Sequence, residues 1–98
     1  MPQDGVLADI AERFGALSDE TRLRILCALA REELCVCDLA QVAGRSIAAV
    51  SHQLALLRRL KLVAYRNEGK LAYYRLDSEL VRRLLRDATR RRSTRSAG

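Results

Sequence analysis

The chain has 98 residues, of which 31% are charged and 49% apolar, and its formal net charge is +6. This length supports one small domain, and the composition indicates a soluble globular chain rather than a disordered one. Because no apolar run approaches the ~20 residues that span a bilayer and the acidic N-terminal stretch is not a signal peptide, we expect a cytoplasmic protein with no membrane partner.

Apolar residues recur at helical spacing in the first part of the chain. The spacing predicts a first helix over residues 5–17 and a second that starts behind Ser18 as N-cap and ends near residue 30. Cys27, at the edge of the second helix, is expected to behave as a small core residue. The stripe that the second helix is expected to bury consists of Leu23, Leu26, Leu29 and Ala30.

The middle of the chain predicts two short helices joined by a tight turn. Anchors from Leu34 to Val42 indicate a helix that ends at Gly44 as its C-cap, and Ser46 is placed to cap a further helix over residues 47–60. The buried stripe expected for that further helix is Ile47, Val50, Leu54 and Leu57.

The C-terminal part predicts a hairpin and a last helix. The segments LVAYR and KLAYYRL, separated by residues 67–69, are typical of a β-hairpin. Asp77 or Ser78 caps the last helix, and residues 91–98 are predicted to be a basic, disordered tail. The fold class is therefore mainly α with a small β-hairpin, in one domain over residues 1–90.

Positive charge is concentrated after the tight turn. Residues 1–44 carry four basic and eight acidic side chains, a net charge of −4, whereas residues 45–75 carry seven basic side chains and one acidic, a net charge of +6. Two short helices, a turn with Gly and a basic hairpin predict a winged helix-turn-helix that binds double-stranded DNA.

The predicted reading helix presents short side chains near its start. Ser51, His52 and Gln53 are suited to hydrogen bonds with base edges, Gln53 bidentately with adenine, while Ala48 and Ala49 permit close approach. The alternative is that each is an ordinary solvated or locally packed side chain. The other residues expected at the DNA are Arg45, Ser46, Arg58, Arg59, Arg66 and Lys70.

The apolar stripes of the first and last helices lack enough of a partner within so short a chain. Their pairing across a homodimer would bury both stripes and would place two reading helices one helical turn apart on an operator with an inverted repeat.

Cys35 and Cys37 form a candidate metal site. In a helix this spacing turns the side chains about 200° apart, but a pair that straddles a helix start can converge if the first residue is extended. A helix N-terminus favours thiolates, which prefer soft ions such as Cd(II), Pb(II), As(III), Cu(I) or Zn(II) to hard cations. Two thiolates are too few for a complete site, and the candidates for a third donor are Cys27, His52, solvent, and Asp4 or Asp9 from a second copy.

Several segments are similar to one known family. Residues 33–40, ELCVCDLA, resemble the cysteine box of the ArsR/SmtB metalloregulatory repressors; residues 51–54, SHQL, resemble their recognition helix, and residues 18–22, SDETR, the start of their second helix. The likeness covers residues 7–85. It implies a homodimeric repressor that releases its operator when Cd(II), Pb(II) or As(III) binds Cys35 and Cys37.

The chain departs from the family pattern at three places. It looks most like the CadC branch, whose sulfur site includes cysteines of an N-terminal arm, and residues 1–17 contain none. Ala40 stands where arsenite sensors carry a third cysteine. Zn(II) is the less favoured effector, because the positions that match the family's zinc site carry Ser78, Leu80, Arg91 and Thr94.

Two further functions compete with metal sensing. A repressor of the same fold could respond to oxidants or persulfides through Cys35, Cys37 and Cys27, or the chain could be a metal-blind architectural DNA-binding protein. We expect no enzyme and no small-molecule substrate, because no catalytic triad, paired-carboxylate or phosphate-loop pattern occurs and the one His lies on the expected DNA face.

Overall fold

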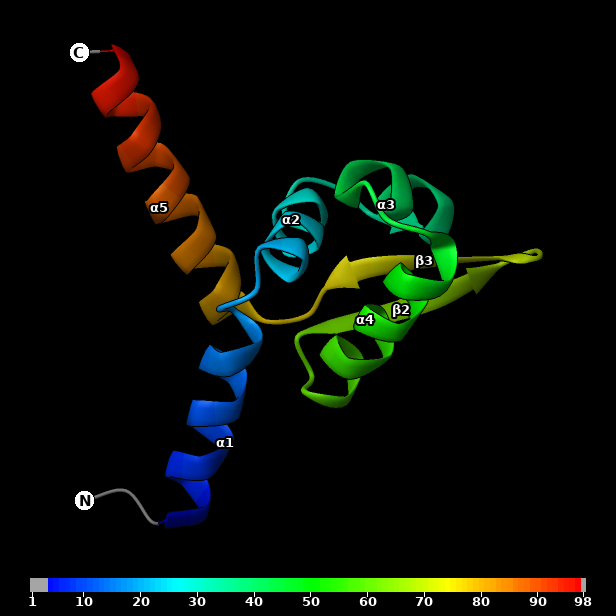
Figure 1. The fold of residues 1–98 in the computed structure, drawn as a ribbon, viewed down its shortest axis with the longest axis horizontal. Coiled ribbons are helices and arrows are strands. Elements are labelled where there is room, and N and C mark those ends of the chain that lie inside the picture. The colour runs from blue at the N-terminus through cyan, green and yellow to red at the C-terminus, as the bar shows by residue number, and fades with distance from the viewer. Residues whose placement is uncertain (1–3, 98) are drawn as a thin grey trace.

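The computed structural model describes the backbone of residues 4–97 and the side chains of residues 5–90. In this part, α2, α3, α4 and the sheet gather on one side, whereas α1 and α5 extend away from them in different directions (Figure 1). This is the winged helix-turn-helix that the sequence predicted. The elements are α1 Asp4–Ala16, α2 Glu20–Leu29, β1 Leu34–Cys35, α3 Val36–Ala43, α4 Ile47–Arg59, β2 Val63–Glu68, β3 Leu71–Leu76 and α5 Glu79–Ala97.

The start of α2 differs from the prediction. Asp19, not Ser18, is the N-cap: its backbone is extended, and its carboxylate accepts a hydrogen bond of 3.0 Å from the backbone N–H of Arg22. The hydroxyl of Ser18 instead donates to the carbonyl of Gly15 at 2.6 Å, at the end of α1. Two adjacent residues could each serve as a cap, and the one used is decided by which has the extended backbone.

The turn between α3 and α4 is as predicted. Gly44 ends α3 in the left-handed conformation, with φ of 66°, which a residue with a side chain adopts only under strain. Ser46 caps α4, since its hydroxyl accepts from the backbone N–H of Ala49 at 3.1 Å. This turn fixes where the reading helix begins.

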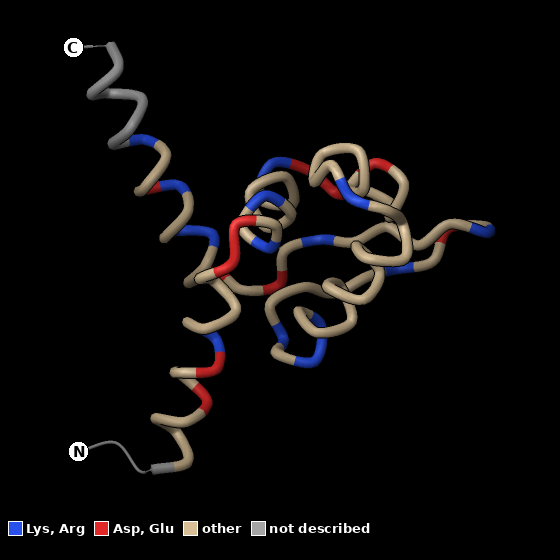
Figure 2. The backbone as a smooth tube through the Cα atoms, in the orientation of Figure 1, with Lys and Arg blue, Asp and Glu red and all other residues tan. Residues whose placement is uncertain are grey.

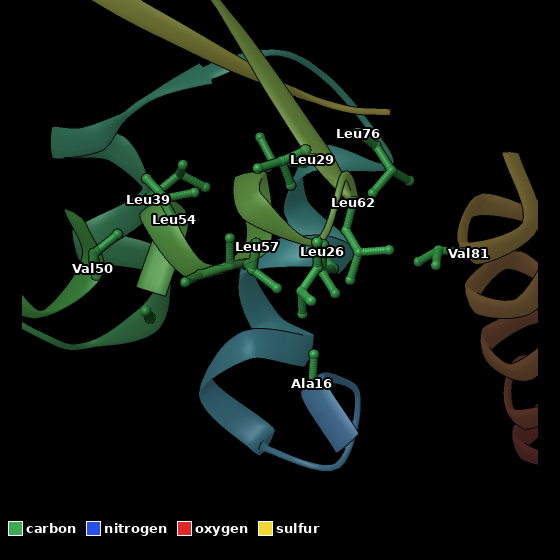
Figure 3. Close-up of a cluster of buried hydrophobic side chains, with 14 of the residues drawn as sticks. Ala16, Leu26, Leu29, Leu39, Val50, Leu54, Leu57, Leu62, Leu76 and Val81 are labelled. Atoms are coloured by element: carbon green, nitrogen blue, oxygen red, sulfur yellow. The ribbon is translucent and has the colours of Figure 1, made fainter. Parts of the chain in front are cut away.

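The core gathers around one face of α4. Val50, Leu54 and Leu57 are fully buried, as predicted, and point toward side chains from α2, α3 and the strands (Figure 3). The prediction for Ile47 was wrong, because this first residue of α4 lies beyond the edge of that core and is 53% exposed.

The buried face of α2 is rotated from the predicted one. Ile25, Leu26 and Leu29 are buried, whereas Leu23 and Ala30 are only half-buried. The reason is that the core with α3 and α4 lies on the Ile25 side of the helix, while Leu23 faces a hollow shared with α1 and α5.

The sheet has one strand more than predicted. Besides the β2–β3 hairpin, β1 pairs antiparallel with β3, with Leu34 opposite Tyr74 and Cys35 opposite Tyr73, and the strand order is β1-β3-β2. A strand of two residues is too short to show a period of two in the sequence, so it is recognisable only by its partner.

The hairpin turn is also tighter than predicted. Asn67 and Glu68, expected in the turn, extend β2 and pair with Ala72 and Leu71 of β3. The connection is left to Gly69, with φ of 64°, and the residue after it. Longer paired strands carry the wing further from the core.

Ser78, rather than Asp77, caps α5, because its hydroxyl accepts from the backbone N–H of Val81 at 3.2 Å. The helix extends to Ala97 and so runs through most of the segment, residues 91–98, that the sequence assigned to a disordered tail. The side chains of that segment lie outside the described residues, and the domain boundary at residue 90 stays a prediction. Within the described residues, none of the helices is both long and apolar enough to cross a membrane.

Candidate DNA-reading surface and thiol site

The outer face of α4 carries the side chains that the sequence proposed for base reading. Because Val50, Leu54 and Leu57 are buried, the helix turns Ala48, Ala49, Ser51 and His52 outward, and all four are exposed. These are small or hydrogen-bonding side chains, which is what an approach to base edges in a major groove requires.

Gln53 differs from its neighbours on this face. It is half-buried, and its Oε1 accepts a hydrogen bond of 2.7 Å from Nε of Arg22 on α2. The sequence gave no sign of this contact, since the two residues are 31 positions apart. The alternative that Gln53 packs locally therefore has structural support.

Basic side chains lie around the outer face of α4. Arg45, Arg58 and Arg59 are exposed, as is Lys70 at the turn of the wing, and Figure 2 shows Lys and Arg after α4 and at the tip of the hairpin. The guanidinium of Arg58 lies 5.0 Å from the ring centre of Tyr65, so that it joins the end of α4 to the wing.

The side chain of Arg66 is exposed but is paired with other residues of the protein. Its guanidinium pairs with Glu68 and, at 2.9 Å, with Glu33, and it lies 5.3 Å from the ring centre of Tyr73. The hydrogen bonds to Glu68 and Glu33 raise the pKa of Arg66 above its usual value. A phosphate contact at this residue, as the sequence proposed, has to compete with two carboxylates.

Cys35 and Cys37 straddle the start of α3, as the sequence anticipated. Cys35 is the N-cap residue with an extended backbone, φ −83° and ψ 170°, and Cys37 lies in the first turn of the helix. Cys35 is half-buried, Cys37 is exposed, and both are free thiols. The Sγ of Cys35 donates to Oδ2 of Asp38 at 3.4 Å. An extended residue followed by the helix start is the arrangement that lets two such thiols converge.

The thiol segment is tied directly to the wing. Through β1, Cys35 pairs with Tyr73 of β3, and two residues earlier Glu33 pairs with Arg66 of β2. A movement at Cys35 therefore reaches the wing by two contacts that sequence reasoning missed.

The donor set near the cysteines is small. Among the described side chains, no three His, Cys, Asp or Glu residues are grouped so that they could hold a metal ion, and so Cys27 and His52 are not brought together with the cysteine pair. Cys27 lies on α2 beside hollows that face α5 and α1, and burial raises the pKa of its thiol. The thiols of Cys35 and Cys37 are donors of the kind that soft ions prefer, but two donors do not complete a site.

The helices α1 and α5, which extend from the core, carry an exposed apolar face. Phe14 is 59% exposed and Leu80 is 75% exposed, and they border one groove between α1 and α5. The other large apolar side chains exposed on these helices are Val6, Leu7, Ile10 and Leu84. Exposed apolar area of this kind on a small domain is typical of an interface.

Comparison with known proteins finds bacterial regulators. A family model described as "Bacterial regulatory protein, arsR family" matches residues 19–65. The chain is 51% identical over 81 residues to a cadmium resistance transcriptional regulatory protein CadC homolog of Staphylococcus aureus. The matched region is 82% of this chain and 67% of that relative. It is 53% identical over 78 residues to a transcriptional repressor SmtB homolog of Synechocystis, and this matched region is 80% of this chain and 59% of that relative. The chain thus spans about three-fifths to two-thirds of the length of these relatives.

A solved structure of a possible ArsR-family regulator is similar to this chain in both fold and sequence. The homodimeric winged helix-turn-helix DNA-binding domain of a possible ArsR-family regulator from Mycobacterium bovis is 33% identical, with a TM-score of 0.80 over 90% of this chain and 84% of that one. The relatives are transcriptional regulators and not enzymes, as the sequence predicted.

Proposed function

The chain belongs to the arsR family of bacterial regulatory proteins, and we propose that it is a homodimeric repressor that releases its operator when a thiophilic metal or metalloid binds Cys35 and Cys37. The observation that carries this proposal is the pairing of Cys35 with Tyr73, because it puts a thiol in the same sheet as the wing. A cytoplasmic location follows, since the operator is there.

In this proposal α4 reads the bases and its surroundings hold the phosphates. Ala48, Ala49, Ser51 and His52 face the major groove, because they are the exposed side chains of the helix. The residues proposed at the phosphates are Arg45, Arg58, Arg59 and Lys70, with Arg66 partly engaged by its carboxylates, and Ser46 lies beside them as the N-cap of α4. Gln53 lies beside the reading face.

The homodimer is supported by the apolar face of α1 and α5. Its exposed residues, led by Phe14 and Leu80, would be buried against a second copy, and the similar domain from Mycobacterium bovis is homodimeric. A dimer with a two-fold axis presents two reading helices, which matches an operator with an inverted repeat.

The effector proposed is Cd(II), Pb(II) or As(III), with Zn(II) less suited. Thiolates select soft ions, and a bound ion supplies strong bonds that hold both sulfur atoms at one point. Convergence of Cys35 and Cys37 would shift the extended residue at the start of α3 and, through β1, the wing. The expected result is a change of the angle between the two reading helices, with lower affinity and no unfolding. By thermodynamic reciprocity, operator DNA weakens metal binding by the same factor.

A thiol-based redox or persulfide response is the second candidate. It is favoured by the exposure of Cys37 and by the small donor set around the pair within the described residues. Here the two thiols react with peroxide or polysulfide instead of sharing an ion.

One experiment separates the candidates. Operator release is measured by fluorescence anisotropy with Cd(II), Pb(II), As(III), Zn(II), polysulfide and peroxide for the wild type and for the Cys35→Ser/Cys37→Ser protein, with Cys27→Ser as the matched control. Metal-dependent release with thiolate–metal absorption, lost only in the double variant, supports metal sensing. Release by oxidants alone, with a disulfide between Cys35 and Cys37, would support the redox candidate, and no release by any effector would support the architectural one.

A further inference from the structure

Arg22, in the first turn of α2, is joined to Gln53, in the middle of α4. Nε of Arg22 donates to Oε1 of Gln53 at 2.7 Å, and both side chains are half-buried. The backbone of Arg22 is itself held, because its N–H donates to the carboxylate of Asp19. Within the part of the chain whose side chains are described, this is the only hydrogen bond between side chains of α2 and α4.

This bond fixes which way the Gln53 amide faces. A guanidinium carries donors and no acceptor, so the oxygen of the amide has to face Arg22 and its NH₂ group has to face away. Bidentate pairing with adenine needs both groups directed at one base edge. With its oxygen directed at α2, Gln53 does not offer that pair of groups to DNA.

We propose that Gln53 is a positioning residue, and that Arg22 acts through it to set the rotation of α4 about its own axis. Val50, Leu54 and Leu57 bury one side of the helix, but apolar contact is non-directional, whereas a hydrogen bond has a preferred direction. The link thereby sets where Ser51 and His52 project. This inference rests on the proposed DNA-binding function.

Three substitutions separate positioning from base reading. Gln53→Glu keeps an acceptor for Arg22 but removes the NH₂ group, Gln53→Met removes both groups at similar length, and Arg22→Met removes the donor. Gln41, exposed on α3, provides the matched controls Gln41→Glu and Gln41→Met. The probes are a duplex selected by the wild-type protein from a random-sequence pool and a scrambled duplex of the same composition.

The quantity measured is the ratio of the affinities for the selected and the scrambled duplex. We expect Gln53→Met and Arg22→Met each to lower this ratio by about tenfold or more, because tenfold lies at the lower end of the range for a hydrogen bond to a charged group. The double variant should lose no more than either single one, because both remove the same link. Gln53→Glu, compared with Gln41→Glu, should keep the wild-type ratio. Thermal unfolding checks that each variant is folded.

Two results would overturn the inference. In the first, Gln53→Glu lowers the affinity ratio as much as Gln53→Met does, while Arg22→Met keeps the wild-type ratio. Gln53 would then read a base with its NH₂ group. The other is an additive loss in the double variant. If the Met variants do not fold, Gln53→Glu against the wild type and Gln41→Glu decides the matter, because an unchanged ratio supports the positioning role and a loss of about tenfold or more overturns it. Failure of the wild-type protein to select any duplex would instead refute the proposed function.

Discussion

Replacement of Ser46 by Ala tests how the start of the reading helix is held. The hydroxyl of Ser46 accepts from the backbone N–H of Ala49 at 3.1 Å, at an exposed position. Loss of such a cap costs about 1 kcal/mol of stability, and exposure to water favours the lower half of the usual range of about 0.5–2 kcal/mol. We therefore expect Ser46→Ala to lower the free energy of unfolding by about 0.5–1 kcal/mol.

The free energy that the Ser46 cap contributes also sets an upper limit on the loss of DNA affinity in Ser46→Ala. Ala48 and Ala49 lie in the turn that the cap closes. If this turn frays, it has to re-form on the operator, and the penalty does not exceed the free energy that the cap contributed. The affinity for DNA should accordingly fall by no more than about fivefold.

A matched control exists on α5. Ser78 caps that helix with the same chemistry, its hydroxyl accepting from the N–H of Val81 at 3.2 Å, far along the chain from the reading helix. Urea unfolding of Ser78→Ala should show a similar loss of stability, and fluorescence anisotropy should show unchanged DNA affinity. Ser46→Asn, which also provides a cap, should restore both properties.

Either of two outcomes would refute this reasoning. Unchanged stability of Ser46→Ala together with a loss of affinity above about tenfold would mean that the hydroxyl contacts the DNA itself, because a cap of this strength cannot account for it. An equal loss of affinity in Ser78→Ala would mean that the effect is not local to α4.

Three further predictions concern the thiols, the wing and the core. Glu33→Gln should weaken the effector-induced loss of operator affinity by about two- to fivefold, the size of one exposed ion pair. Glu68→Gln, which removes the ion pair within the wing, should leave that loss unchanged. Equal effects of the two substitutions would contradict a coupling of the thiol segment to the wing through Glu33. Because burial raises the pKa of Cys27, mass spectrometry should show slower alkylation of Cys27 than of exposed Cys37 at neutral pH and a smaller difference as the pH rises; the reverse order would contradict the burial. Leu54→Ala should lower the free energy of unfolding by about 2–5 kcal/mol in urea, since Leu54 is fully buried, and a loss under about 1 kcal/mol would mean that α4 is not fixed by this contact.

Local chemistry made much of the motif predictable. Gly44 and Ser46 act through their own backbone and side chain, so their roles as the C-cap of α3 and the N-cap of α4 could be read from the sequence. The buried spacing of Val50, Leu54 and Leu57 likewise fixes one face of a helix whatever it packs against.

Contacts between distant residues were not predictable. Arg66 was assigned to phosphate because it is basic and on the wing, but its partner Glu33 is 33 positions away in the chain. Arg22 and Gln53 are likewise joined only by the packing of α2 beside α4. β1 exists as a strand only because β3 lies beside it. In each case tertiary structure, not the nearby residues, determines the role.

These distant contacts bear on how derepression would work in the proposed repressor. The reading helix is tied to α2 by Arg22 and to the wing by Arg58, and the wing is tied to the thiol segment by β1 and Glu33. Elements joined at so many points move as one body, because distortion of any one of them breaks contacts in the others. The helices α1 and α5, which carry the apolar face, extend away from this body (Figure 1), and α5 contacts it through the hydrogen bond of 3.0 Å from Arg82 to the carbonyl of Ala30. A shift at Cys35 is therefore expected to reorient the whole body relative to α1 and α5, so that operator affinity falls by misalignment of two intact reading helices rather than by loss of either one.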